Sequence, residues 1–136
     1  MRKKIIKLLL IIVMTISLIA CEKQEMNNYK LKVIKSSWSG WDEDYFPEDK
    51  TFEYDIELNK EYEVSKGSLG LTFTIKKINK DNIVIDTTEP FSDSEKGISL
   101  RTDKTEFVIE KGKTLKLTTP TMDAGNIYYL SLEKVK

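Results

Sequence analysis

Apolar and polar residues alternate with a period of two over much of this 136-residue chain. The clearest example runs from Phe52 to Leu58, where every second residue is apolar and the residues between are Glu53, Asp55 and Glu57. Successive side chains of a β-strand point to opposite faces of a sheet, so this alternation is typical of a strand with one buried face. No stretch of eleven or more residues shows a persuasive helical period. The chain is therefore expected to fold mainly as β-strands.

Similar segments recur along the chain, separated by turn-forming residues. The turn residues 79–82 lie between two of them and predict a β-hairpin. Ala124 is the only alanine after residue 20, whereas valine, isoleucine and threonine, which favour sheets, are abundant. The expected strands lie at residues 29–34, 52–58, 62–64, 71–75, 83–85, 98–100, 106–109, 114–117 and 127–132.

About seven to nine short antiparallel strands predict one all-β domain over residues 29–136, arranged as a β-sandwich. A small β-barrel is the alternative. Residues 123–130 (Asp-Ala-Gly-Asn-Ile-Tyr-Tyr-Leu) resemble the turn and strand entry of immunoglobulin-like domains, in which a corner tyrosine returns its hydroxyl to nearby backbone. The resemblance implies an immunoglobulin-like sandwich with Tyr128 as the corner residue and Leu130 at the next core position. An ordinary turn followed by an aromatic strand is the other interpretation.

The first twenty residues differ in composition from the rest of the chain. Four basic residues within the first seven are followed by an apolar run over residues 8–19, broken only by Thr15 and Ser17. A basic start, a short apolar region and a small residue near a cleavage point define a secretory signal. The run is also shorter than the roughly 20 apolar residues that a membrane-spanning helix needs. Residues 1–20 are therefore predicted to be a signal peptide that is removed.

The residues at the end of this leader indicate a lipid anchor. Leu18-Ile19-Ala20-Cys21 resembles the lipobox of bacterial lipoproteins, in which a signal peptidase cuts just before the cysteine. The resemblance implies that the sulfur of Cys21 carries a diacylglycerol and that residues 21–28 form a lipidated tether. Two acyl chains suffice for stable anchoring, and seven residues reach at most about 25 Å. We therefore expect the domain to stay close to the extracytoplasmic face of the cell membrane.

Removal of the leader changes the charge and the thiol content of the chain. The whole chain has 22 basic and 22 acidic residues, and the leader contains four of the basic ones, which leaves 18 against 22 and a net charge of about −4. So weakly acidic a domain lacks the basic patch that nucleic-acid binding needs, which excludes that partner class. Cys21 is the only cysteine, so the mature core is expected to hold by packing without a disulfide.

The residue types that are missing argue against catalysis. The chain has no histidine, which excludes Ser-His-Asp and Cys-His catalysis and the histidine ligands of common zinc sites. It also has no glycine-rich phosphate loop and no dinucleotide-binding motif. We therefore expect a protein that is not an enzyme and uses no cofactor. Carboxylates in the acidic loop described next leave hydrolysis of glycans as a further alternative.

One segment, residues 36–50, concentrates binding chemistry because it holds both tryptophans, two further aromatics and several carboxylates. Loops carry binding residues disproportionately, and exposed aromatics pack against sugar rings and protein partners. The alternatives are tryptophans that plug the end of the sandwich and a solvated acidic loop. The carboxylates do not match the spacing of a calcium-binding loop, so no metal site is expected. The candidate ligand-binding residues are Trp38, Trp41, Asp42, Asp44, Tyr45 and Phe46.

These features predict a lipid-anchored, non-catalytic binding or accessory module at the cell surface. The expected partners are the membrane, reached through the diacylglyceryl group on Cys21, and a protein or glycan that the sequence does not identify. An inhibitor or immunity-type protein that blocks an extracytoplasmic enzyme is the alternative.

Overall fold

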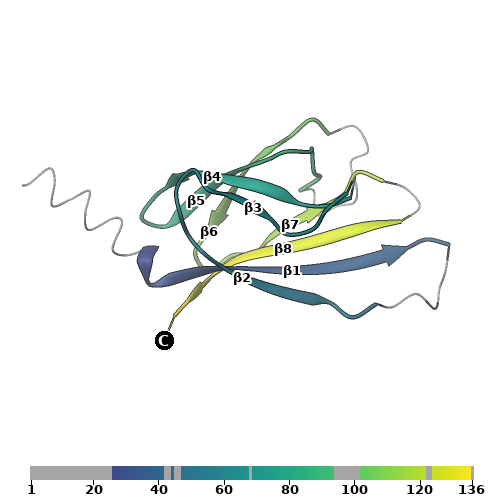
Figure 1. Ribbon diagram of the computed structural model, residues 1–136, viewed down its shortest axis with the longest axis horizontal. Coiled ribbons are helices and arrows are strands. Elements are labelled where there is room, and N and C mark those ends of the chain that lie inside the picture. The colour runs from purple at the N-terminus through teal and green to yellow at the C-terminus, as the bar shows by residue number, and fades with distance from the viewer. Residues whose placement is uncertain are drawn as a thin grey trace, which may run out of the picture.

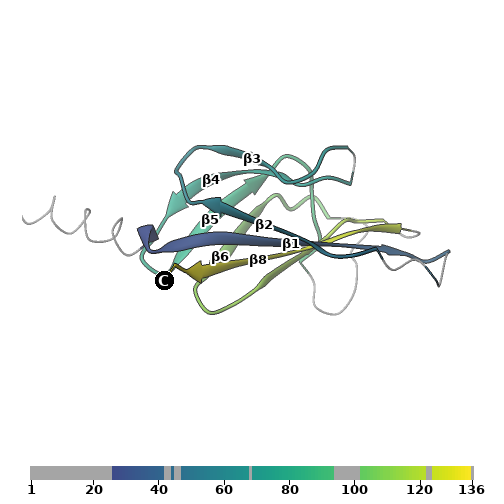
Figure 2. The same cartoon turned by 60° about the horizontal axis from the view of Figure 1, so that its bottom comes forward.

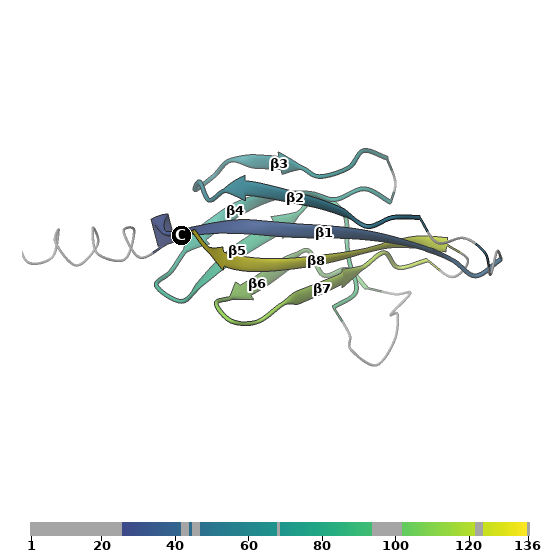
Figure 3. The same cartoon turned by 90° about the horizontal axis from the view of Figure 1, so that it is seen from below.

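A computed structural model of the chain describes residues 26–41, 44, 47–67, 69–93, 102–121 and 124–135. Eight strands within these ranges form two four-stranded antiparallel sheets (Figure 1). The first sheet has the strand order β2-β1-β8-β7, seen side by side in Figure 3, and the second has the order β3-β4-β5-β6. The strands are β1 (Tyr29–Ser39), β2 (Lys50–Asp55), β3 (Glu61–Glu63), β4 (Thr72–Ile78), β5 (Asn82–Thr87), β6 (Glu106–Glu110), β7 (Leu115–Thr118) and β8 (Ala124–Lys134).

The two sheets form two layers, which Figure 2 shows from a second direction, and this arrangement confirms the predicted β-sandwich rather than the small barrel. Neighbouring strands are also consecutive in the chain, except that β1 pairs with β8. The chain therefore passes between the sheets from β2 to β3 and from β6 to β7. Immunoglobulin domains use Greek-key connections instead, so the likeness of residues 123–130 to that family stays local. Within the described ranges, no helix has the length and apolar character needed to cross a bilayer.

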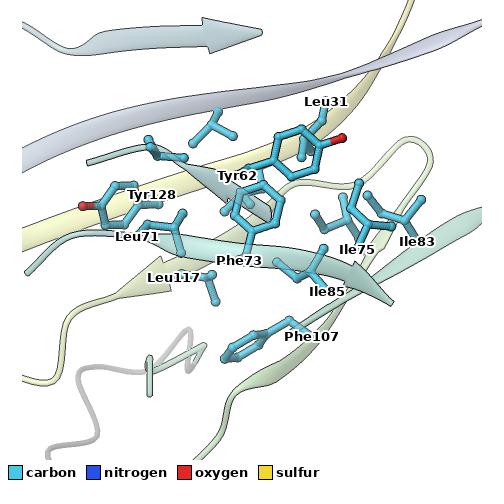
Figure 4. Close-up of a cluster of buried hydrophobic side chains, with 14 of the residues drawn as sticks. Leu31, Tyr62, Leu71, Phe73, Ile75, Ile83, Ile85, Phe107, Leu117 and Tyr128 are labelled. Atoms are coloured by element: carbon cyan, nitrogen blue, oxygen red, sulfur yellow. The ribbon is translucent and has the colours of Figure 1, made fainter. Parts of the chain in front are cut away.

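The facing sides of both sheets supply the core, as the period-two pattern predicts. In β5, for example, Ile83 and Ile85 are fully buried, while Val84 between them is partly exposed. Figure 4 shows side chains of this kind from the two sheets meeting between the layers. The largest fully buried side chains are Leu31, Val33, Leu71, Phe73, Ile75, Ile83, Ile85, Phe91, Ile109, Leu117, Tyr128 and Leu130.

The structure changes the bounds of several predicted strands, most clearly at residues 52–58 and 29–34. The strand expected at residues 52–58 ends at Asp55, because the chain turns there toward the second sheet through Asn59, whose φ of 62° lies in the left-handed region that asparagine tolerates. The strand expected at residues 29–34 continues to Ser39, since β8 supplies hydrogen-bonding partners beyond residue 34. The strand expected at residues 98–100 lies outside the described residues.

Aromatic rings join the two sheets at the edge where the chain passes from β2 to β3. Tyr54 of β2 meets Tyr62 of β3 edge to face, with 5.4 Å between ring centroids, and Tyr62 stacks on Phe73 of β4 at 5.2 Å. The Tyr62 hydroxyl donates to the carbonyl of Asp55 and accepts from the amide of Glu57. Because β2 and β3 share no backbone ladder, these contacts hold the edge of the sandwich together.

Tyr128 packs its ring and returns its hydroxyl to backbone, as a corner tyrosine does, but the backbone partner is distant in the sequence. Its ring is fully buried and meets Phe91 edge to face at 5.8 Å, and Leu130 takes the next core position as expected. The hydroxyl donates to the carbonyl of Leu69 at 2.8 Å, and Ser65 Oγ lies 2.7 Å from it. Leu69 lies 59 residues away between β3 and β4, so this bond joins two distant parts of the chain.

We expect Tyr128→Phe to cost about 1 kcal/mol at neutral pH, because the Leu69 carbonyl keeps a second donor in Asn126 Nδ2 at 2.9 Å. Burial raises the pKa of Tyr128 above its ordinary 10.0, against the opposing effect of hydrogen bonds from Ser65 and Asn126. The stability that depends on a neutral phenol is complete below pH 10.0 and is lost as the pH rises through the higher folded-state pKa. Urea titrations at several alkaline pH values should therefore show that the free energy of unfolding falls less steeply with pH in the variant than in the wild type. An equally steep fall in both proteins would contradict this role.

Candidate functional site

Strands β1 and β8 extend together beyond the rest of the first sheet. The pairing of β2 with β1 reaches only Lys35, and the pairing of β7 with β8 stops at Ile127. Residues 37–39 and 124–126 continue as a two-stranded ribbon at the end of the sandwich opposite the entry of the chain (Figure 1). We call residues 37–41 together with residues 124–126 the distal tip.

Trp38 lies directly opposite Gly125 in this ribbon. A Cβ at position 125 would come within 3.1 Å of Trp38 Nε1 and would collide with the hydroxyl oxygens of Thr119 and Thr121. The glycine therefore leaves the space in which the indole lies. Trp38 Nε1 is itself buried and lacks a hydrogen-bond partner among the described residues, an arrangement that costs free energy until another group supplies an acceptor.

The other face of the ribbon is polar, because successive side chains of a strand alternate. Ser37 and Asn126 are opposite each other, and Ser37 Oγ donates to Asn126 Oδ1 at 2.7 Å. Asn126 Nδ2 donates to the Leu69 carbonyl at 2.9 Å, so the amide is held at both ends and ties the tip to the β3–β4 connection. A depression of about 310 Å³ adjoins these groups, and its lining residues are Ser37, Trp38, Ser39, Leu69, Ala124, Gly125 and Asn126.

Trp41 follows the ribbon and is the most exposed large hydrophobic side chain that the structure describes, with 80% of its surface accessible. Its backbone amide donates to Ser39 Oγ at 3.3 Å within the turn after β1. An indole costs free energy when it is left in water, and aromatic side chains of this kind dominate the contacts of protein interfaces. The distal tip thus combines an exposed indole, a partly buried indole and a fixed amide.

The structure brings two of the six predicted binding residues together at the tip. The alternative prediction, that the tryptophans plug the end of the sandwich, agrees in part with Trp38, which is partly buried. It does not agree with Trp41, which is exposed. Asp44 is exposed in the connection to β2. The remaining residues Asp42, Tyr45 and Phe46 lie outside the described part of the chain, as does Cys21 with the leader.

The sequence did not reveal the contribution of β8 to this site. Ser37 and Asn126 are 89 residues apart, and only the pairing of the first strand with the last makes them neighbours. The one available signal was Gly125, since a glycine at the start of a strand pattern often marks a close approach of another group.

The groups of the distal tip are suited to recognition. Hydroxyl, amide and indole groups form hydrogen bonds and stacking contacts, and they do not titrate near neutral pH as a general acid or base would. The described ranges contain no group of three or more His, Cys, Asp or Glu side chains that could hold a metal ion. Comparison with known proteins adds no assignment, because no family model, curated protein or solved structure matches the chain.

Proposed function

We propose that this protein is a lipid-anchored, non-catalytic binding module that presents its distal tip to a protein or glycan at the cell surface. The observation that carries the proposal is Trp41, which is 80% exposed three residues after Trp38, whose buried Nε1 has no hydrogen-bond partner among the described residues. Aromatic side chains held at the end of a rigid scaffold are typical of recognition surfaces. The lipobox-like residues around Cys21 supply the anchor in this proposal.

The path of the chain supports this arrangement. The described chain begins at Met26, five residues after Cys21, and β1 starts at Tyr29 and runs to the distal tip. Eleven residues of extended strand span about 36 Å, so the tip lies at the end of the domain away from the anchor. Anchoring would keep the tip at a high effective concentration near other surface molecules.

Trp41→Ala tests the proposal with little risk to folding, because Trp41 lies outside the buried core. We expect at least a tenfold loss of affinity for the ligand that the wild-type protein captures on intact cells, as for removal of a central interface aromatic. Val108→Ala is the matched control, since it shortens another exposed apolar side chain, 46% accessible on β6. Its affinity should equal that of the wild type.

The measurement combines capture on living cells with a titration of the purified ligand against each variant. Trp38→Phe keeps an aromatic ring but removes the indole N–H, and its urea midpoint shows whether any loss of binding comes from unfolding. If Trp41→Ala and Val108→Ala retained the same ligand with equal affinity, the distal tip would not be the binding surface and the proposal would fail. A captured ligand that is an extracytoplasmic enzyme and loses activity on binding would identify the protein as an inhibitor.

A further inference from the structure

A second depression, of about 420 Å³, lies at the opposite end of the sandwich, where the chain enters it. The end of β4, the connection from β2 to β3 and the residues just before β1 form its walls. Most of its lining is apolar, with two lysines among the lining residues. We call it the entry groove, and the residues that carry the argument are Met26, Ile56, Leu58, Ile78, Lys76 and Lys77.

A β-bulge brings both lysines to the surface of the groove. The register of β4 with β5 shifts between Ile75 and Lys77, and Lys76 and Lys77 are consequently both exposed. Neither lysine forms an ion pair within the described part of the chain, whereas Glu57, the one carboxylate among the lining residues, pairs with Lys60 at 2.8 Å. The groove therefore presents two uncompensated positive charges.

The apolar part of the groove also reaches solvent. Leu58 is 49% exposed, and Ile56 and Ile78 beside it are partly buried. An apolar side chain between lysines suits the boundary of a bilayer, where the apolar group enters the headgroup layer and the ammonium groups reach lipid phosphates.

The groove lies close in the chain to the proposed anchor. Met26 lines the groove and only residues 22–25 separate it from Cys21, so an extended chain places these two residues within about 18 Å of each other. An acylated Cys21 would therefore hold this end of the domain against the bilayer. In the described part of the connection from β1 to β2, at the other end, Asp44, Glu48 and Asp49 are exposed, and an anionic surface would repel these carboxylates.

We propose that the entry groove docks on the anionic phospholipid surface of the membrane that holds Cys21, with Leu58 in the headgroup layer and Lys76 and Lys77 on lipid phosphates. This inference rests on the proposed function, because it requires the anchor. It also extends that function, since an anchor alone lets the domain move on its tether. Docking of the groove fixes the orientation of the domain and points the distal tip away from the bilayer.

The test uses the processed lipidated protein, which begins at Cys21, reconstituted in vesicles of phosphatidylcholine with or without phosphatidylglycerol. The chain has one cysteine, which the anchor occupies, so Leu58→Cys supplies a single thiol for a polarity-sensitive fluorophore. We expect the emission to report an apolar environment with phosphatidylglycerol vesicles only. Phosphatidylcholine vesicles and soluble glycerol phosphate should have no effect, and high salt should reverse the change because it screens the charges.

Paired charge reversals identify the groups responsible. Lys76→Glu/Lys77→Glu should lower the ratio of docked to undocked domain at least about tenfold, because each lysine near an anionic surface contributes about a fivefold attraction. Lys50→Glu/Lys116→Glu reverses the charge of two exposed lysines outside the groove and should dock as the wild type does.

Flotation of the vesicles separates the two proposals. Protein that does not float with either kind of vesicle lacks the anchor, and the proposed function then fails together with the docking. Protein that floats but whose fluorophore ignores the lipid charge overturns the docking alone. A fluorophore that is already shielded before vesicles are added also overturns it, because the tether or a second copy of the chain then fills the groove.

Discussion

Phe73→Ala should lower the free energy of unfolding by about 3–5 kcal/mol. Phe73 is fully buried in β4 and its ring stacks on Tyr62 at 5.2 Å, so truncation leaves a cavity between the sheets and removes a contact at the β2–β3 edge. Domains of this kind are stable by only about 5–15 kcal/mol, and the single cysteine of this chain allows no internal disulfide. We expect a large decrease in the urea midpoint with an unchanged m value.

Val108→Ala is the control for this experiment, because Val108 lies on the outer face of the same sheet with 46% of its surface exposed. The free energy of unfolding of Val108→Ala should fall by less than about 1 kcal/mol, as for most substitutions of exposed residues. Equal losses for the two variants, or a loss below about 1 kcal/mol for Phe73→Ala, would contradict the core described here.

The period-two pattern predicted strands well where one face of the strand meets the core. The segments expected at residues 83–85 and 106–109 are the centres of β5 (Asn82–Thr87) and β6 (Glu106–Glu110). The pattern failed for the second half of β1, where the apolar alternation stops after Val33 and the backbone is held by pairing with β8. Burial of one face of a strand requires apolar residues at alternate positions, whereas backbone pairing with a strand far away in the sequence requires no particular residue type.

The functional surfaces were predictable to different degrees. Trp38 and Trp41 stand out by residue type and by their position together in one segment. Gly125 became part of the site only through the register of the first strand with the last. The joint exposure of Lys76 and Lys77 depends on a β-bulge, which interrupts the alternation on which strand prediction relies.

Cys21→Ser should abolish processing of the leader completely. A serine hydroxyl is a far weaker nucleophile than a cysteine thiolate, so no thioether to diacylglycerol should form at this position. The lipobox resemblance implies that cleavage follows lipidation, so the variant should retain residues 1–20, visible as a larger intact mass. Lys23→Ala, two residues away, is the control and should be processed as the wild type is. Cleavage of Cys21→Ser after Ala20 would show that the leader is removed by another route.

The mass of the N-terminal peptide of the native protein, taken from the membrane fraction, tests the account most directly. We predict a peptide that begins at Cys21 and carries a diacylglyceryl group on its sulfur. An unmodified Cys21, or a peptide that still contains residues 1–20, would contradict the anchor and with it the outward orientation of the distal tip.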